Sequence, residues 1–84
     1  MEKLEQIILS IVSNEQGIKE LALIVKIIEE YSRNNIKPFP SDIDIMTALD
    51  NLVKREKIIA LNYILAKHPN KLKTIYFENG TKIL

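Results

Sequence analysis

The sequence predicts an α+β domain of three helices followed by a C-terminal β-hairpin. Before residue 56, apolar residues recur at helical spacing in three segments, which is typical of amphipathic helices. From Ile58 onwards the apolar residues alternate along the chain, which is the period of a strand. Prolines, asparagines and a glycine separate these segments, and such residues favour turns and loops. A chain of 84 residues has room for one core, so we expect a single domain over residues 1–84.

The first two helices are expected at about residues 2–13 and 18–33. The first carries a single apolar stripe, made of Leu4, Ile7, Ile8, Ile11 and Val12. The stripe of the second helix that we expect to face the core consists of Leu21, Ile24, Val25, Ile28 and Tyr31. Leu23 and Ile27 lie outside this stripe. Either a neighbouring element covers Leu23 and Ile27, or they form the interface of a homodimer.

The third helix is expected at about residues 41–55, after a loop that contains two prolines. Ser41 and Asp44 have the spacing of a capping box, which contributes about 1 kcal/mol. The inward face of this helix is predicted to consist of Ile45, Ala48, Leu49, Leu52 and Val53. We also expect Phe39, in the preceding loop, to fold back into the core.

The hairpin is predicted from two strands at about residues 58–66 and 72–78. The segment His68-Pro69-Asn70 between them has the composition of a turn. Asn79-Gly80 is a second strong turn signal, after which residues 81–84 either fold back as a short strand or fray.

Two segments carry a resemblance to a known superfamily. Residues Ile45 to Ile58 are similar to the third helix of many bacterial regulators, and Ile75 to Gly80 are similar to the second wing strand and closing turn of PadR- and MarR-type regulators. Together with the order of elements, they make the chain resemble the winged helix-turn-helix superfamily over nearly its whole length. The resemblance implies a three-helix winged helix-turn-helix domain whose C-terminal β-hairpin is the wing. Members often have glycine where Glu56 stands, and the loop before the third helix is longer here than a tight turn.

Charge is distributed unevenly along a chain whose net charge is +1. Residues 1–42 hold five basic and seven acidic side chains, whereas residues 43–84 hold seven basic and four acidic ones. Between residues 54 and 73 there are six basic side chains and one acidic one, an excess of +5. Such a basic region is typical of proteins that bind nucleic acid. The simpler interpretation is that solvated strands carry lysines.

Duplex DNA is therefore the expected partner, and a transcriptional regulator the expected function. The resemblance implies that the outer face of the third helix enters the major groove, where Asn51 could read adenine and Thr47 could contact a thymine methyl group or a phosphate. The expected DNA-binding residues are Ile43, Thr47, Asn51, Lys54, Arg55, Lys67, His68, Asn70, Lys71 and Lys73. Asp50 opposes this function unless it pairs with Lys54 at i,i+4.

A second function competes with DNA binding. The third helix is acidic, Ile43 is expected to point outward, and the second helix has more apolar residues than one core requires. These features indicate a winged-helix protein–protein interaction module, of phage or mobile-element type, that docks on a host protein without binding DNA.

Catalysis, cofactors and metals find no support in the sequence. The chain has no cysteine, and its one histidine, His68, has neither a nearby nucleophile nor companion ligands. We therefore expect no enzymatic activity, no cofactor and no metal site. The N-terminus lacks a signal-peptide pattern and no apolar run approaches the length of a membrane span, so a cytoplasmic protein is expected.

Overall fold

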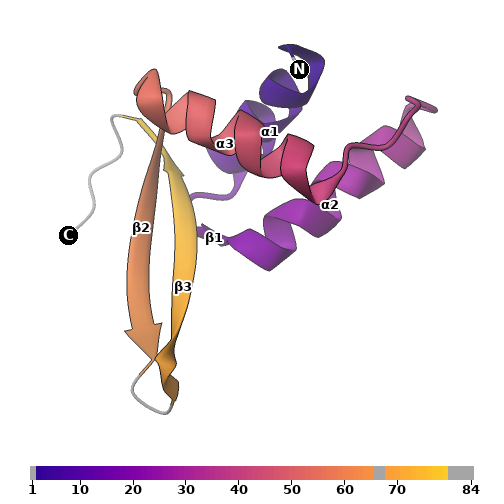
Figure 1. Ribbon diagram of the computed structural model, residues 1–84. Helices are drawn as coiled ribbons and strands as arrows, with labels where there is room; N and C mark the ends of the chain where they lie inside the picture. Colours follow the sequence, from indigo (N-terminus) through magenta and orange to yellow (C-terminus); the bar gives the residue numbers. More distant parts are fainter. Residues whose placement is uncertain (1, 66–67, 80–84) are drawn as a thin grey trace.

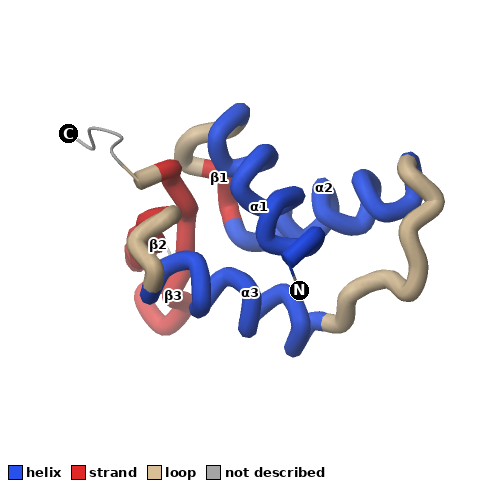
Figure 2. Tube along the Cα trace, turned by 90° about the horizontal axis from the view of Figure 1, so that it is seen from above, coloured by secondary structure: helices blue, strands red, loops and turns tan. Residues whose placement is uncertain are grey.

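The protein folds as an α+β structure in which three helices pack beside a three-stranded antiparallel sheet (Figure 1). This computed structural model describes residues 2–65 and 68–79, and for residues 2, 63–65 and 68–72 it describes the backbone alone. The elements are α1 (Glu2–Asn14), β1 (Ile18–Lys19), α2 (Glu20–Arg33), α3 (Asp42–Lys54), β2 (Ile58–Leu65) and β3 (His68–Glu78). The hairpin of β2 and β3 extends away from the helices, whereas α1 packs against both α2 and α3 (Figures 1 and 2).

The helix boundaries follow from local sequence signals. α3 begins with the predicted capping box, in which Ser41 Oγ accepts a hydrogen bond from the Asp44 amide at 3.1 Å and Asp44 Oδ2 accepts one from the Ser41 amide at 3.1 Å. α1 ends where the polar segment after Ser13 reaches Gly17. That glycine has a φ of +82°, and a Cβ there would lie 3.3 Å from the Phe77 ring. The chain can therefore turn sharply into β1.

The short strand β1 was not expected, because residues 18 and 19 were assigned to the second helix. Ile18 pairs with Tyr76 and Lys19 pairs with Ile75 on β3, which gives the strand order β1-β3-β2. A strand of two residues has no sequence period of its own. Its conformation depends on hydrogen bonds to a segment almost sixty residues away, such as the Gly17 amide donating to the Tyr76 carbonyl at 2.8 Å.

The core is one cluster of apolar side chains from all three helices and the sheet. Its buried members are Leu4, Ile8, Ile11, Val12, Ile18, Leu23, Ile27, Tyr31, Ile45, Ala48, Leu49, Leu52, Ile58 and Tyr76. The predicted inward faces of α1 and α3 are confirmed in outline, with Ile7 and Val53 only partly buried. Full burial of each Leu or Ile contributes about 1.5–3 kcal/mol, so these faces determine how the helices pack.

The predicted core face of α2 is wrong. Leu23 and Ile27 are both 0% exposed and lie at the centre of the core, whereas Leu21 is 74% exposed and Val25 is also exposed. The helix is therefore rotated from the expected orientation, and Tyr31 is the only residue of the predicted stripe that is fully buried. Leu23 and Ile27 are covered within the chain, so they cannot form a dimer interface.

Two further expectations about the loops are corrected. Phe39 does not enter the core, since it is 49% exposed in the segment between α2 and α3. His68-Pro69-Asn70 is not the hairpin turn, because β3 already begins at His68, which pairs with Leu65. The register changes between Ile64, opposite Leu72, and Leu65, so residues 69–71 form an irregularity in β3. Proline is tolerated at such a bulge because its missing N–H is not required by the ladder. The predicted turn at Asn79-Gly80 and the segment 81–84 lie largely outside the described residues.

Candidate nucleic-acid interface

The outer face of α3 carries the side chains that were expected to read DNA. The cap at Ser41 fixes where the helix starts, and the buried face fixes its rotation, so Ile43, Thr47 and Lys54 point to solvent. Ile43 is 77% exposed, as predicted. Asn51 is half-buried and presents less of its amide to a partner than the sequence pattern predicted.

The electrostatics of this face are acidic. α3 carries Asp42, Asp44 and Asp50 but ends with a single lysine. Lys54 Nζ lies 2.9 Å from Asp50 Oδ2, which confirms the predicted i,i+4 pair. Between exposed side chains such a pair is worth little to stability, but it lowers the positive charge that Lys54 offers to a phosphate. The outer face of α3 is therefore a poor surface for a polyanion.

Arg55 has a structural partner. It caps the C-terminal end of α3, and its guanidinium pairs with the largely buried carboxylate of Glu5 on α1. Its Nε also donates to the Asn51 carbonyl at 3.4 Å. These contacts join α3 to α1, so Arg55 is engaged within the protein rather than free for DNA.

The hairpin is the most basic part of the chain. Residues 57–77 contain four lysines, Lys57, Lys67, Lys71 and Lys73, and no acidic residue. Lys57 and Lys73 are exposed, and no ion pair involving either is found among the described residues. Lys67 and the side chains of His68, Asn70 and Lys71 lie outside the described part of the structure. The hairpin extends away from the helices, which separates its far end from α3 (Figure 1).

The base of the hairpin is fixed by contacts that the sequence interpretation did not predict. Glu56 has a φ of +58°, in the left-handed region, where the chain leaves α3 for β2. The Asn79 side-chain amide donates to the Glu56 carbonyl, the Asn79 amide donates to the Lys57 carbonyl at 3.1 Å, and Gln16 Oε1 accepts from the Glu78 amide at 2.7 Å. The sequence contained a signal for the left-handed conformation of Glu56, since glycine often stands at this place in the winged-helix regulators that the sequence resembles.

Two buried tyrosines have altered acidity. Burial, and to a lesser extent the negative charge of Glu20, raise the pKa of Tyr76 from 10.0 to about 12. Burial, followed by the charge of Asp44, also raises the pKa of Tyr31. Both phenols therefore stay protonated at neutral pH. Their role is structural, since Tyr76 joins the sheet to the core and Tyr31 ends the inner face of α2.

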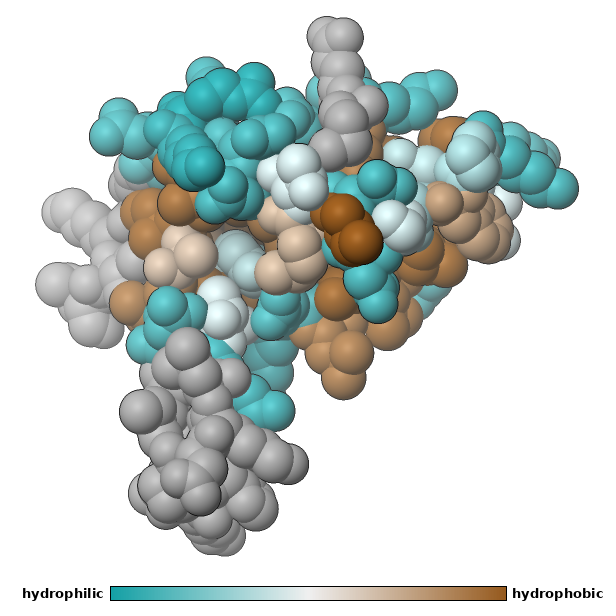
Figure 3. Space-filling model, in the orientation of Figure 1, coloured by the Kyte–Doolittle hydropathy of each residue, from teal (hydrophilic) through white to brown (hydrophobic). Residues whose placement is uncertain are grey.

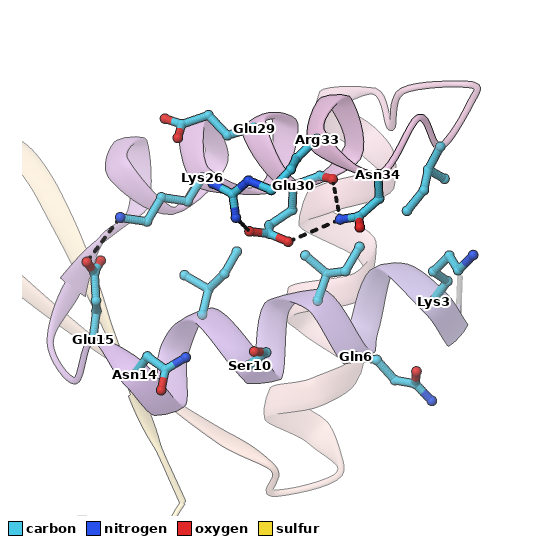
Figure 4. Close-up of a pocket in the computed structure, with 13 residues that line it drawn as sticks. Lys3, Gln6, Ser10, Asn14, Glu15, Lys26, Glu29, Glu30, Arg33 and Asn34 are labelled. Carbon is cyan, nitrogen blue, oxygen red and sulfur yellow. Dashed lines mark hydrogen bonds and ion pairs between the residues drawn. The ribbon is translucent and has the colours of Figure 1, made fainter.

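A groove of about 460 Å³ lies between α1 and α2 (Figure 4). Ile7 and Ile11 line it together with charged residues that pair among themselves. Lys26 Nζ lies 3.0 Å from Glu15 Oε1, and Arg33 pairs with Glu30 on the same helix. Its three basic residues (Lys3, Lys26 and Arg33) are matched by three acidic ones (Glu15, Glu29 and Glu30). The groove is therefore not an anion site.

The surface in view in Figure 3 mixes hydrophilic and apolar side chains over the helices. The large apolar side chains that are exposed are Leu21, Val25, Phe39, Ile43, Met46 and Leu61. None of the helices in the described residues is long and apolar enough to cross a membrane. No family model, curated protein or solved structure matches this chain.

Proposed function

We propose that this chain is a winged-helix DNA-binding protein, a transcriptional regulator that holds duplex DNA mainly through its basic hairpin. Three helices followed by a hairpin are compatible with that fold. The observation that carries the proposal is the charge of residues 57–77, where four lysines occur without any acidic residue. A projecting hairpin of this kind suits a phosphate row or a minor groove, because lysines contribute to affinity there without base-specific geometry.

In this proposal α3 has a minor role in binding. Direct readout depends on arginine, lysine, asparagine or glutamine reaching base edges, and α3 offers Asn51, half-buried, and Lys54, paired with Asp50. Thr47 remains available for a phosphate or a thymine methyl group. We therefore expect weak sequence preference and strong dependence on salt.

A salt titration with matched charge variants tests the proposal. Replacement of Lys67, Lys71 and Lys73 by glutamine should weaken binding to random duplex DNA and reduce the slope of log K against log salt by about 2.7 for each chain bound, since each phosphate contact contributes about 0.9. The matched control replaces Lys3, Lys26 and Lys37, which lie on the helices and their connecting loop, and removes the same charge. Its slope should stay near that of the wild type. Equal losses in the two variants, or no binding at about 50 mM salt, would contradict the proposal.

A second function is favoured by one observation, the exposure of Ile43 and Met46 on an acidic helix. Such a face suits a basic and apolar segment of a host protein better than it suits DNA. This candidate makes the chain a protein-interaction module of phage or mobile-element type. It predicts recovery of a stoichiometric protein partner that survives nuclease treatment and is lost in Ile43→Asp, while Leu21→Asp, an equally exposed position on α2, retains the partner.

A further inference from the structure

Strand β2 is an unprotected edge of the sheet. In the order β1-β3-β2 it has a strand neighbour on one side only, within the residues that the structure describes. Its sequence, Ile-Ile-Ala-Leu-Asn-Tyr-Ile-Leu, contains no charge and no proline. Edge strands of monomeric proteins usually carry a lysine, a proline or a bulge that prevents pairing with another chain. β2 carries none of these over the segment Ile58–Ile64 that pairs regularly with β3.

The hydrogen-bond pattern shows which backbone groups face that free edge. The Asn79 amide donates to the Lys57 carbonyl at 3.1 Å just beyond the paired strands, so residues 57 and 79 occupy the position of a hydrogen-bonded pair, although the Lys57 amide donates to Leu52 instead. Because such pairs alternate, residues 59, 61 and 63 also point their backbone groups toward β3. The backbone groups of Ile58, Ala60, Asn62 and Ile64 therefore point outward. A second hydrogen bond supports this assignment. Tyr76 lies opposite Ala60, and its carbonyl accepts from the Gly17 amide rather than from β2.

The sheet face beside this edge is apolar. Ala60 and Tyr76 pack toward the helices, so their neighbours along each strand point to the opposite face. Ile59 lies opposite Phe77 and Leu61 lies opposite Ile75 on that outer face. Ile59, Ile75 and Phe77 are partly buried, whereas Leu61 is 39% exposed. The apolar surface thus continues up to the unpaired edge.

We propose that β2 pairs in antiparallel fashion with β2 of a second copy of this chain, which joins the two sheets into one. A strand paired with itself about a two-fold axis presents the same groups on both sides, so one set of outward donors meets an identical set of acceptors. A register in which odd-numbered residues lie opposite odd-numbered residues, such as Leu61 opposite Leu61, keeps the outer faces of the two sheets on the same side. The apolar surface then continues across both copies.

Charge favours the antiparallel arrangement with a second copy. β2 is neutral along its length, so two such strands meet without like-charge repulsion. Antiparallel pairing directs the ends of the two hairpins in opposite directions, which keeps Lys67, Lys71 and Lys73 of one copy away from those of the other. Parallel pairing would bring these lysines together. This edge takes the place of Leu23 and Ile27 as the surface for self-association.

Sedimentation of wild type and paired variants tests the inference. Wild type should show a mass near twice 9.7 kDa at high micromolar concentration. Leu61→Lys, which places a charge on the edge, and Asn62→Pro, which removes an outward N–H, should both sediment as monomers. The controls are Leu21→Lys, the same substitution on exposed α2, and Asn62→Ala, which loses the same side-chain hydrogen bond to Thr74 but keeps the N–H. Both controls should remain dimeric.

Amide exchange of the wild type provides a measurement that needs no variant. The amides of Ile58, Ala60, Asn62 and Ile64 should exchange more slowly as the protein concentration rises, while the exchange of amides in α1 stays constant. A wild type that stays monomeric to millimolar concentration would overturn the inference. So would larger assemblies, a dimer that persists in both edge variants or dissociates equally in both controls, or exchange at these four amides that is independent of concentration.

Discussion

Glu56, at the base of the hairpin, has an unfavourable backbone conformation whose free-energy cost can be measured. Glu56 adopts a φ of +58°, and a side chain with a Cβ is disfavoured there by about 1 kcal/mol relative to glycine. The turn is nevertheless fixed, because the Asn79 side chain and the Lys57 amide, which donates to Leu52 at 2.9 Å, hold it from both sides. Surrounding contacts thus maintain a conformation that the residue itself does not favour.

Glu56→Gly should therefore stabilise the protein. We expect a gain of about 0.5–1 kcal/mol in the free energy of unfolding, because relief of the left-handed conformation exceeds the added entropy of the unfolded chain. Urea denaturation followed by circular dichroism measures the change. Glu56→Ala is the control, since it removes the same carboxylate but keeps a Cβ. Equal stability of the glycine and alanine variants would show that the backbone conformation carries no cost.

Tyr76 makes stability depend on alkaline pH. Its pKa in the folded protein is about 12, above the ordinary value of 10.0, so the folded state holds the phenolic proton more tightly than the unfolded state does. The resulting stabilisation is complete below about pH 10 and is lost as the pH rises toward 12, with an upper bound of roughly 2–3 kcal/mol. Unfolding measured across this range should show a steeper fall in wild type than in Tyr76→Phe. Parallel curves would contradict the assignment.

Among the helices, α1 and α3 show where sequence reasoning succeeds, and α2 shows where it fails. α1 and α3 each have one apolar stripe, so spacing alone identified their buried faces. α2 carries apolar residues over a wide arc, and two sets of them fit the helical period, one with Leu21 and Val25 and one with Leu23 and Ile27. Contact with α1 selects the second face, and that choice depends on packing rather than on the helix itself.

A pair of alanine substitutions two residues apart measures this orientation. Leu23→Ala should lower the free energy of unfolding by about 2–4 kcal/mol, because it leaves a cavity in the core. Leu21→Ala removes the same atoms from an exposed position and should change it by less than about 0.5 kcal/mol. Thermal or urea denaturation provides both values. A larger loss of stability in Leu21→Ala than in Leu23→Ala would show that Leu21 faces the core, as expected from the sequence.

The hairpin illustrates a second limit of the sequence. Its existence and the first strand were predictable from alternation, but the second strand starts earlier than expected, since Pro69 was interpreted as part of a turn. β1 was missed for a related reason, because two residues become a strand only when β3 lies beside them. The candidate DNA-binding set stays a prediction from residue type and position. The pairing of Arg55 with Glu5 could not be predicted, since it joins elements fifty residues apart.

For the whole molecule, the arrangement of charge matters more than its total. A net charge of +1 gives little attraction to DNA, yet four lysines occur in the hairpin segment 57–77, whereas residues 1–56 hold seven basic and ten acidic side chains. The acidic residues of α3 sit on a different element. In the proposed function, this separation would let the hairpin attract phosphates while the acidic face of α3 stays better suited to a protein partner.

If the hairpin binds DNA and β2 mediates dimerisation, the two activities must be linked through the number of hairpins that one complex presents. A dimer offers two hairpins to one duplex, so its salt slope should be roughly twice that of a monomer, in which each phosphate contact adds about 0.9. Asn62→Pro tests this without a change in charge, and we expect its slope to be about half the wild-type value. Asn62→Ala, which keeps the outward N–H, should retain the full slope. An unchanged slope in a monomeric Asn62→Pro would show that the hairpins act singly, whereas loss of all binding would show that one hairpin is too weak to hold DNA without its partner.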